Sequence, residues 1–210
     1  CHHPDLEVQA VCRICVVEVE GEKLLQPACA YPVRDNMVVH TNTPGVRHAR
    51  RVNLELILAH HPTDCLQCIR NRNCELQALA ERLGIREVRF ERRLRGLPPD
   101  ESTPAIVREP DKCISCRRCV AMCRDVQAAT VLWPVGRGVD TVVAPACERE
   151  LSDVACALCG QCIHACPVGA IAERDDTEKV FRALADPTKH VVVQTAPATR
   201  VSIGEELGFP

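Results

Sequence analysis

Apolar and polar residues alternate only over short stretches, which predicts small elements joined by many turns. The clearest strand is expected at Val16-Val17-Glu18-Val19-Glu20, followed by a turn at Gly21-Glu22. Residues 96–104 (GLPPDESTP) are polar and rich in proline, so we expect a domain boundary there. No apolar run approaches the roughly 18 residues that a membrane span needs.

Two longer segments carry the spacing of apolar residues that is typical of helices. Thr43-Pro44 would start the first, with threonine as N-cap and proline at the first helical position. Its apolar periodicity continues to His60, and Pro62 ends it. The second helix is predicted from about Cys74 to Leu83, with Gly84 as a C-cap.

Composition adds one strong constraint: the chain is poor in aromatic residues and rich in cysteine. Its 210 residues are 46% hydrophobic with a formal net charge of −2, which disfavours disorder and offers no basic footprint for nucleic acid. There are 16 cysteines but only one Trp, one Tyr and three Phe. Disulfides, zinc or iron–sulfur clusters must therefore help to hold the fold together. Because the sequence starts at Cys1 without a methionine or a signal peptide, we expect it to be a fragment.

The motif C-x2-C-x2-C-x3-C occurs twice in the second half of the chain. Bacterial ferredoxins bind 4Fe–4S clusters with this run, and in two-cluster ferredoxins its fourth cysteine ligates the other cluster. Zinc normally uses two separated C-x2-C pairs, so the third cysteine of each run argues against zinc. If the two repeats exchange their fourth cysteines in this way, one 4Fe–4S cluster is predicted on Cys113, Cys116, Cys119 and Cys166. A neighbouring cluster is predicted on Cys156, Cys159, Cys162 and Cys123.

Two further groups are less specific when taken alone. His61-x3-Cys65-x2-Cys68-x5-Cys74 is suited to zinc or to a cluster with one imidazole ligand, with His60 as the positional alternative to His61. The last group has the spacing C-x10-C-x2-C-x13-C, which differs from that of plant-type ferredoxins and suits a 2Fe–2S cluster, a zinc ion or two disulfides. Its members are Cys1, Cys12, Cys15 and Cys29.

Disulfides explain the cysteines less well than metal sites do. Cysteines separated by two residues make strained disulfides, whereas fifteen cysteines and one histidine fill four metal sites. Only Cys147 is left over, and we expect it to be a small buried hydrophobic residue rather than a ligand.

In this order, the motifs resemble the relay shared by the large subunit of complex I-type NADH dehydrogenases, NAD-linked formate dehydrogenases and large FeFe (iron-only) hydrogenases. The resemblance covers residues 1 to about 185. It implies a 2Fe–2S cluster on Cys1, Cys12, Cys15 and Cys29, and a 4Fe–4S cluster on His61, Cys65, Cys68 and Cys74. If the His61 site held zinc instead, the relay along this order would be interrupted.

The tail favours the hydrogenases. Residues 190–200 (HVVVQTAPATR) and 204–208 (GEELG) look like the start of the FeFe-hydrogenase catalytic domain. The sequence CGQC at 159–162 also resembles these hydrogenases. The other two families would continue into a molybdopterin-type domain. The hydrogenase domain binds its H-cluster through motifs such as TSCCP, and none occurs up to residue 210, so this segment carries no catalytic residue.

The expected fold is therefore α+β, in four parts. These are a truncated β-grasp 2Fe–2S module (1–42), a small helical module with the histidine-ligated 4Fe–4S cluster (43–96), a bacterial-ferredoxin-like module with two 4Fe–4S clusters (97–186), and the start of a hydrogenase catalytic domain (187–210).

The resemblance implies the electron-relay arm of a cytoplasmic FeFe hydrogenase of the NAD-linked, electron-bifurcating type. Its partners would be a flavin- and NAD-binding diaphorase-type subunit, ferredoxin or both, in a hetero-oligomer. The alternatives are the same region of a complex I large subunit or an NAD-linked formate dehydrogenase, and a stand-alone polyferredoxin carrier. A purely structural zinc protein is a more distant alternative.

Overall fold

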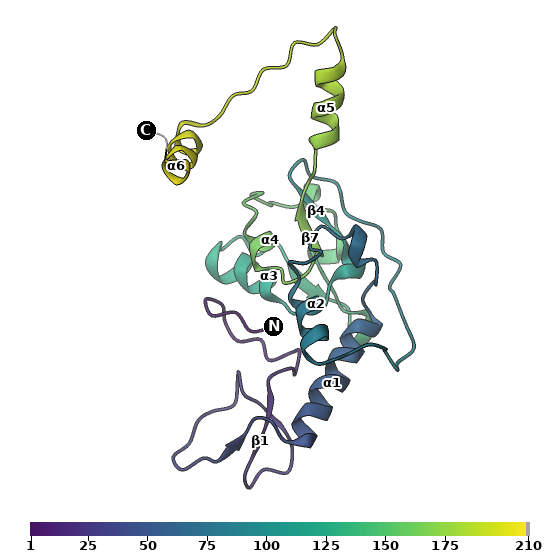
Figure 1. The fold of residues 1–210 in the computed structure, drawn as a ribbon, viewed down its shortest axis with the longest axis vertical. Helices are drawn as coiled ribbons and strands as arrows, with labels where there is room; N and C mark the ends of the chain where they lie inside the picture. Colours follow the sequence, from purple (N-terminus) through teal and green to yellow (C-terminus); the bar gives the residue numbers. More distant parts are fainter. Residues whose placement is uncertain (209–210) are drawn as a thin grey trace. The chain divides into compact units, whose positions relative to one another are not determined.

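The computed structural model describes residues 1–208, and the chain divides into two compact units. The first unit, Cys1–Arg174, contains every cysteine of the chain and is built from short strands and helices (Figure 1). The second unit begins at Asp175 and contributes two helices to the described part. Each unit is therefore described by itself.

Three short strands between residues 16 and 40 form a small antiparallel sheet. Strand β1 (Val16–Val19) lies between β2 (Gln26–Pro27) and β3 (Val39–His40), and its three valines are buried. The predicted strand and its turn are confirmed, because Gly21 has a φ of +85° and the Glu22 N–H donates to the carbonyl of Val19 at 3.0 Å.

Both predicted helices are confirmed. Helix α1 (Pro44–Ala59) begins after Thr43, whose side-chain oxygen accepts a hydrogen bond from the Val46 N–H at 3.2 Å. Helix α2 (Glu75–Arg82) ends before Gly84, which takes a left-handed φ of +63°. Capping residues thus set the start of α1 and the end of α2, as the sequence indicates.

The segment after α2 is tied along α1 by an ion pair. Glu55 on α1 is only 1% exposed and accepts a hydrogen bond from Arg89 Nε at 2.7 Å. This hydrogen bond lowers the pKa of the Glu55 carboxyl, against the opposing effect of burial. Further along, the Arg93 N–H donates to the carbonyl of Ala59 at 3.0 Å. The arginine-rich segment therefore covers α1.

The two cysteine repeats form matching loops. Ser115 and Arg117 have left-handed φ values of 52° and 63°, and Leu158 and Gly160, at the equivalent positions, have 52° and 72°. Each loop leads into a short helix, so the repeat in the sequence is a repeat in structure. The elements are α3 (Arg118–Ala121), its π-helical continuation (Met122–Val126) and α4 (Gln161–Ala165).

Two small antiparallel sheets pack beneath these helices. Strand β4 (Ile106–Arg108) pairs with β7 (Ile171–Glu173), and β5 (Trp133–Val135) pairs with β6 (Val142–Ala144). Short 3-10 turns occur at Cys65–Gln67, Pro110–Lys112, Gly138–Asp140, Ala146–Glu148 and Leu151–Asp153.

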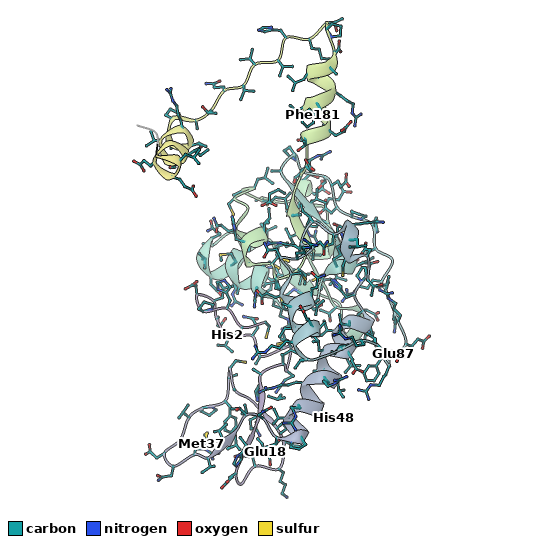
Figure 2. All side chains as sticks on the ribbon, viewed as in Figure 1. His2, Glu18, Met37, His48, Glu87 and Phe181 are labelled. Atoms are coloured by element: carbon teal, nitrogen blue, oxygen red, sulfur yellow. The ribbon has the colours of Figure 1, made fainter. Side chains whose placement is uncertain are left out.

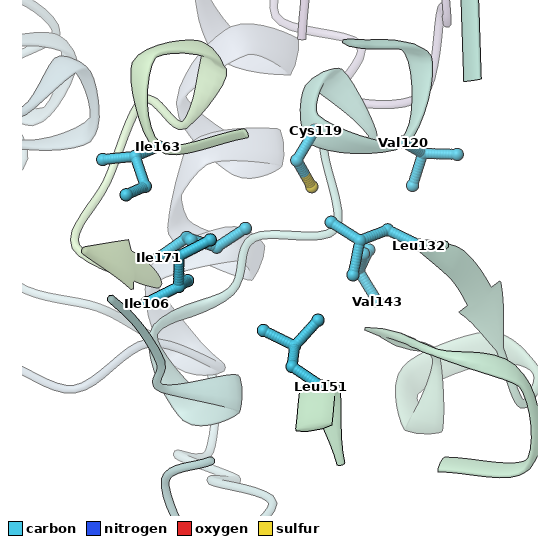
Figure 3. Packing of buried hydrophobic residues seen from close by; sticks show 8 residues of the cluster. All are labelled: Ile106, Cys119, Val120, Leu132, Val143, Leu151, Ile163 and Ile171. Carbon is cyan, nitrogen blue, oxygen red and sulfur yellow. The ribbon is translucent and has the colours of Figure 1, made fainter. Parts of the chain in front are cut away.

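The main core is made of medium-sized aliphatic side chains and sulfur. Ile106, Leu132 and Ile171 are all at most 5% exposed and pack with Cys119 in one cluster (Figure 3). The partly buried residues against this cluster include five cysteines of the two repeats: Cys113, Cys123, Cys156, Cys162 and Cys166. The thiols are therefore part of the core.

The second unit contains α5 (Thr177–Ala185) and α6 (Pro197–Leu207). Phe181 projects from α5 and is 63% exposed (Figure 2). Within residues 1–208, no helix combines the length and the apolar character needed to cross a bilayer. Of the predicted tail domain, Phe209 and Pro210 lie outside the described residues.

Candidate iron–sulfur centres

Four cavities in the first unit are each lined by one predicted ligand set. The structure brings together residues that the chain separates by up to 53 positions, as in the pairing of Cys113 with Cys166. The sets are Cys113, Cys116, Cys119 and Cys166; Cys123, Cys156, Cys159 and Cys162; Cys1, Cys12, Cys15 and Cys29; and His61, Cys65, Cys68 and Cys74.

The exchange of the fourth cysteine between the repeats follows from the packing of their helices. Cys123 follows α3 and Cys166 follows α4, and these two helices lie against each other (Figure 1). The end of each helix therefore carries its cysteine to the cavity of the other repeat.

Cys147 lies outside all four ligand sets, and its surroundings differ from the prediction. It is exposed and has a left-handed φ of 56°, so the expectation of a buried hydrophobic residue was wrong. Its place in a tight 3-10 turn after Pro145 leaves the side chain in solvent. Spacing distinguished it from the ligands but did not indicate its exposure.

The donor sets suit clusters better than single metal ions. Each set lines one cavity, and three closely spaced cysteines in each repeat suit a cluster rather than the two separated C-x2-C pairs typical of zinc. All 16 cysteines are free thiols, which also argues against the disulfide alternative.

Burial makes several of these thiols hard to ionise without a cation. It raises the pKa of Cys116 to about 11 and that of Cys162 to about 12, and neighbouring thiols add to both shifts. Burial also raises the pKa of Cys119 well above its ordinary value. Because coordination deprotonates a thiol outright, iron would supply the charge that these positions lack.

His61 and His60 occupy different environments. Burial lowers the pKa of His61 to about 4, which keeps the ring neutral, and its buried Nδ1 has no hydrogen-bond partner among the described residues. A neutral imidazole with an unpaired nitrogen is the form that ligates a metal. His60 follows the end of α1, where its Nδ1 lies 3.0 Å from the carbonyl oxygen of Leu56, and it does not line this cavity.

Sequence reasoning missed residues that close these cavities from distant parts of the chain. Gly169 lines the His61 cavity, and a Cβ there would lie 2.7 Å from Cys68 Sγ. Lys112 also lines this cavity and pairs with Glu109 at 2.7 Å. Gly169 lies in a turn without a positive φ, so the site needs the missing side chain rather than the backbone freedom of glycine, and the sequence carries no signal for that.

Arg118 joins three segments of the first unit. Its guanidinium pairs with Glu75 at the start of α2 and donates to the carbonyl of His2 at 2.6 Å. The side chain is 9% exposed and lines the Cys1 cavity. The three cysteine-rich parts are therefore held against one another by side-chain contacts as well as by any cluster.

The Cys113 cavity shares lining residues with two of the other three cavities. It shares Arg108 and Ile171 with the Cys123 cavity and Ile114 with the Cys1 cavity. Lys112, next to Cys113, and Gly169, next to Val168, line the His61 cavity. The Cys113 cavity therefore shares lining residues with the Cys123 and Cys1 cavities, and its lining includes chain neighbours of two residues that line the His61 cavity.

Three models of iron–sulfur families match consecutive parts of the chain. Residues 1–44 match a 2Fe-2S iron-sulfur cluster binding domain, and residues 50–89 match the NADH-ubiquinone oxidoreductase-G iron-sulfur binding region. Residues 103–172 match the ferredoxin-like domain of NADH-quinone oxidoreductase subunit 3. The chain is an iron–sulfur region of the NADH-ubiquinone oxidoreductase-G type. The mixed α and β fold of this oxidoreductase-G region thus contains 2Fe–2S and ferredoxin-like domains.

Relatives of the oxidoreductase-G region include hydrogenases and NADH dehydrogenases. It is 52% identical to the NADP-reducing hydrogenase subunit HndD of Solidesulfovibrio fructosivorans over 95% of this chain and 34% of that protein. It is 41% identical to an NADH-quinone oxidoreductase protein of Rhizobium meliloti over 81% of this chain and 20% of that protein. It is also 37% identical to the NADH-ubiquinone oxidoreductase 75 kDa subunit of Reclinomonas americana, over 83% of this chain and 25% of that protein. The chain therefore spans about a third or less of these relatives.

A solved hydrogenase shares the fold. The crystal structure of an NAD+-reducing [NiFe]-hydrogenase in the H2-reduced state superposes with a TM-score of 0.76 at 29% identity, covering 82% of this chain and 73% of that chain. Sequence reasoning did not consider this class of hydrogenase. A hydrogenase of the nickel–iron class therefore contains this fold.

Proposed function

We propose that this chain is the electron-relay region of an iron-only hydrogenase, with one 2Fe–2S and three 4Fe–4S clusters. The observation that carries the proposal is the match between four cavities and four ligand sets. The greater identity to the hydrogenase subunit, 52% against 41%, and the hydrogenase-like tail sequence favour a hydrogenase over an NADH dehydrogenase.

The proposed ligands are the four sets that line the cavities, with His61 rather than His60 in the second set. When bound, each cluster would accept and release one electron, at a potential tuned by charge, hydrogen bonds and burial. The chain supplies such hydrogen bonds: the Val131 N–H donates to Cys123 Sγ at 3.3 Å, and the Ser115 N–H donates to Cys113 Sγ at 3.4 Å. The neutral His61 would leave its site less negative than an all-thiolate site.

The arrangement of the cavities changes the route expected from the sequence order. The Cys1 cavity adjoins the Cys113 cavity directly at Ile114. A path from the Cys1 site therefore does not need to pass through the His61 site. Zinc at His61 would close one branch and leave the other open, in contrast to the serial interpretation of the sequence.

The proposed function also implies partner proteins and a particular continuation of the chain. We expect a flavin- and NAD-binding subunit, ferredoxin or both as electron donors or acceptors, within a cytoplasmic hetero-oligomer. The relatives that match are themselves named as subunits. The alternative is the equivalent region of an NADH dehydrogenase, supported by the NADH-quinone and NADH-ubiquinone oxidoreductase relatives. Sequence following residue 210 distinguishes the two, since an iron-only hydrogenase continues into a domain with TSCCP-type motifs.

Counting iron and sulfide tests the proposed relay. Anaerobically purified protein is expected to contain about 14 irons per chain, with EPR signals of one 2Fe–2S and three 4Fe–4S clusters during stepwise reduction. About ten irons and one zinc would show that the His61 site is structural. Colourless, redox-inactive protein would contradict the relay altogether.

The exchanged cysteines allow a sharper test of the ligand sets. Cys166→Ser is expected to perturb the cluster in the Cys113 cavity, and Cys123→Ser is expected to perturb the cluster in the Cys123 cavity. The reason is that each of these side chains lines the cavity formed by the first three cysteines of the other repeat. EPR during reductive titration measures which 4Fe–4S signal changes. Cys147→Ser is the matched control and leaves all signals unchanged. If either variant instead lost the signal of the cluster held by the first three cysteines of its own repeat, the proposed exchange of fourth cysteines between the repeats would be refuted.

A further inference from the structure

A single arginine lines the cavities of both cysteine repeats. Arg108, at the end of β4, is one of two residues that line both the Cys113 and the Cys123 cavities; the other is Ile171. Its side chain is 6% exposed, and it donates to the carbonyl of Val143 at 2.7 Å. Ile171 is uncharged, so Arg108 is the shared residue that carries a charge to both cavities.

The counter-ion of Arg108 is placed away from the cavities. Asp100 Oδ2 accepts from Arg108 at 3.0 Å and also accepts from the Leu151 N–H at 3.1 Å. Ser102 donates to the other carboxylate oxygen through its N–H and its hydroxyl group. Asp100 lines neither cavity, whereas Arg108 lines both.

The backbone holds this pair in a fixed orientation. The Asp100 N–H donates to the carbonyl of Arg108 at 2.8 Å, and the Arg108 N–H donates back at 3.0 Å. Together with the carbonyl of Val143, these contacts fix both ends of the Arg108 side chain. A buried guanidinium held in place by hydrogen bonds at both ends cannot turn into solvent, where its charge would be screened.

We propose that the charge of Arg108 raises the reduction potentials of the two 4Fe–4S clusters of the repeats together, and that Asp100 partly offsets this charge. The inference rests on the proposed relay. A reduced cluster carries one more negative charge than an oxidised one, so a fixed positive charge in a medium of low polarity stabilises the reduced state. Because one guanidinium serves both sites, their potentials shift in the same direction.

Two single substitutions with opposite expected signs test this role. Arg108→Gln is expected to lower the ratio of reduced to oxidised cluster at a given applied potential by about tenfold at both sites, which is about 59 mV for one electron. Asp100→Asn is expected to raise the ratio at both sites. EPR-monitored redox titration of the full chain measures both potentials, and iron and sulfide content shows that the clusters are intact.

Arg50→Gln is the matched control. Arg50 also donates to a backbone carbonyl, that of Val16 at 2.9 Å, but it lines none of the four cavities, so both potentials should stay constant. Unchanged potentials in Arg108→Gln and Asp100→Asn, with full clusters, would overturn the inference and leave the relay standing. If the Arg108→Gln protein loses its clusters, the inference is tested by Asp100→Asn alone, whose two potentials must rise. Wild-type protein without two 4Fe–4S signals would overturn the relay itself.

Discussion

Removal of iron and sulfide is expected to abolish the folded structure of residues 1–174. Five cysteines of the repeats pack against the main aliphatic cluster, and all four ligand sets surround cavities rather than one another. With the clusters gone, these cavities would remain as voids inside a core that has few large side chains to fill them. Binding of the metal is then part of the free energy of folding.

Circular dichroism and thermal unfolding measure this effect on anaerobic protein before and after chelation. We expect the cooperative transition to disappear with the iron and to return after reconstitution with iron and sulfide. If the reconstituted protein unfolds with the same transition as the untreated protein, the loss of the transition is due to the removal of iron and not to damage by the chelator. A cooperative transition that persists in iron-free protein would contradict the dependence on clusters.

Gly169→Ala is expected to eliminate the cluster at the His61 site and to spare the other three. The added Cβ would lie 2.7 Å from Cys68 Sγ and 3.6 Å from a side-chain carbon of Ile69, so the ligand loop would have to move. Gly169 lies between Val168 and Ala170, which are 1% and 5% exposed, so the backbone on the other side is held in the core. The proposed ligand Cys68 would therefore be displaced from its cavity.

The measurement is iron content together with the EPR signals of the four clusters. A loss of about four irons with retention of the other three signals is the expected result. Gly45→Ala in α1 is the matched control, because its nearest neighbour would be 3.8 Å away, and a gain of up to about 1 kcal/mol in stability is expected there. Full iron content and an unchanged His61-site signal in Gly169→Ala would contradict the steric interpretation.

Local patterns were predictable where neighbouring residues decide the structure. Helix α1 could be predicted from Thr43-Pro44 and its apolar spacing, because the cap and the first turn are local interactions. The motif C-x2-C-x2-C was equally informative, since three closely spaced sulfurs need a loop around a cluster. Cys147 shows the limit of this approach, because burial depends on what packs against a residue and its 3-10 turn leaves it exposed.

The sequence by itself therefore determined the main helices and the iron–sulfur class of the protein, and it grouped the cysteines of the repeats in the same way as the cavities do. Only the tertiary structure decided what joins the sites: Gly169 against Cys68, and Arg108 between two cavities. It also decided that the Cys113 cavity shares lining residues with the Cys123 and Cys1 cavities. Contacts between residues distant in the chain have no spacing rule, because they depend on how separate elements pack. A glycine or an arginine in such a contact looks ordinary until the fold brings its partner to it.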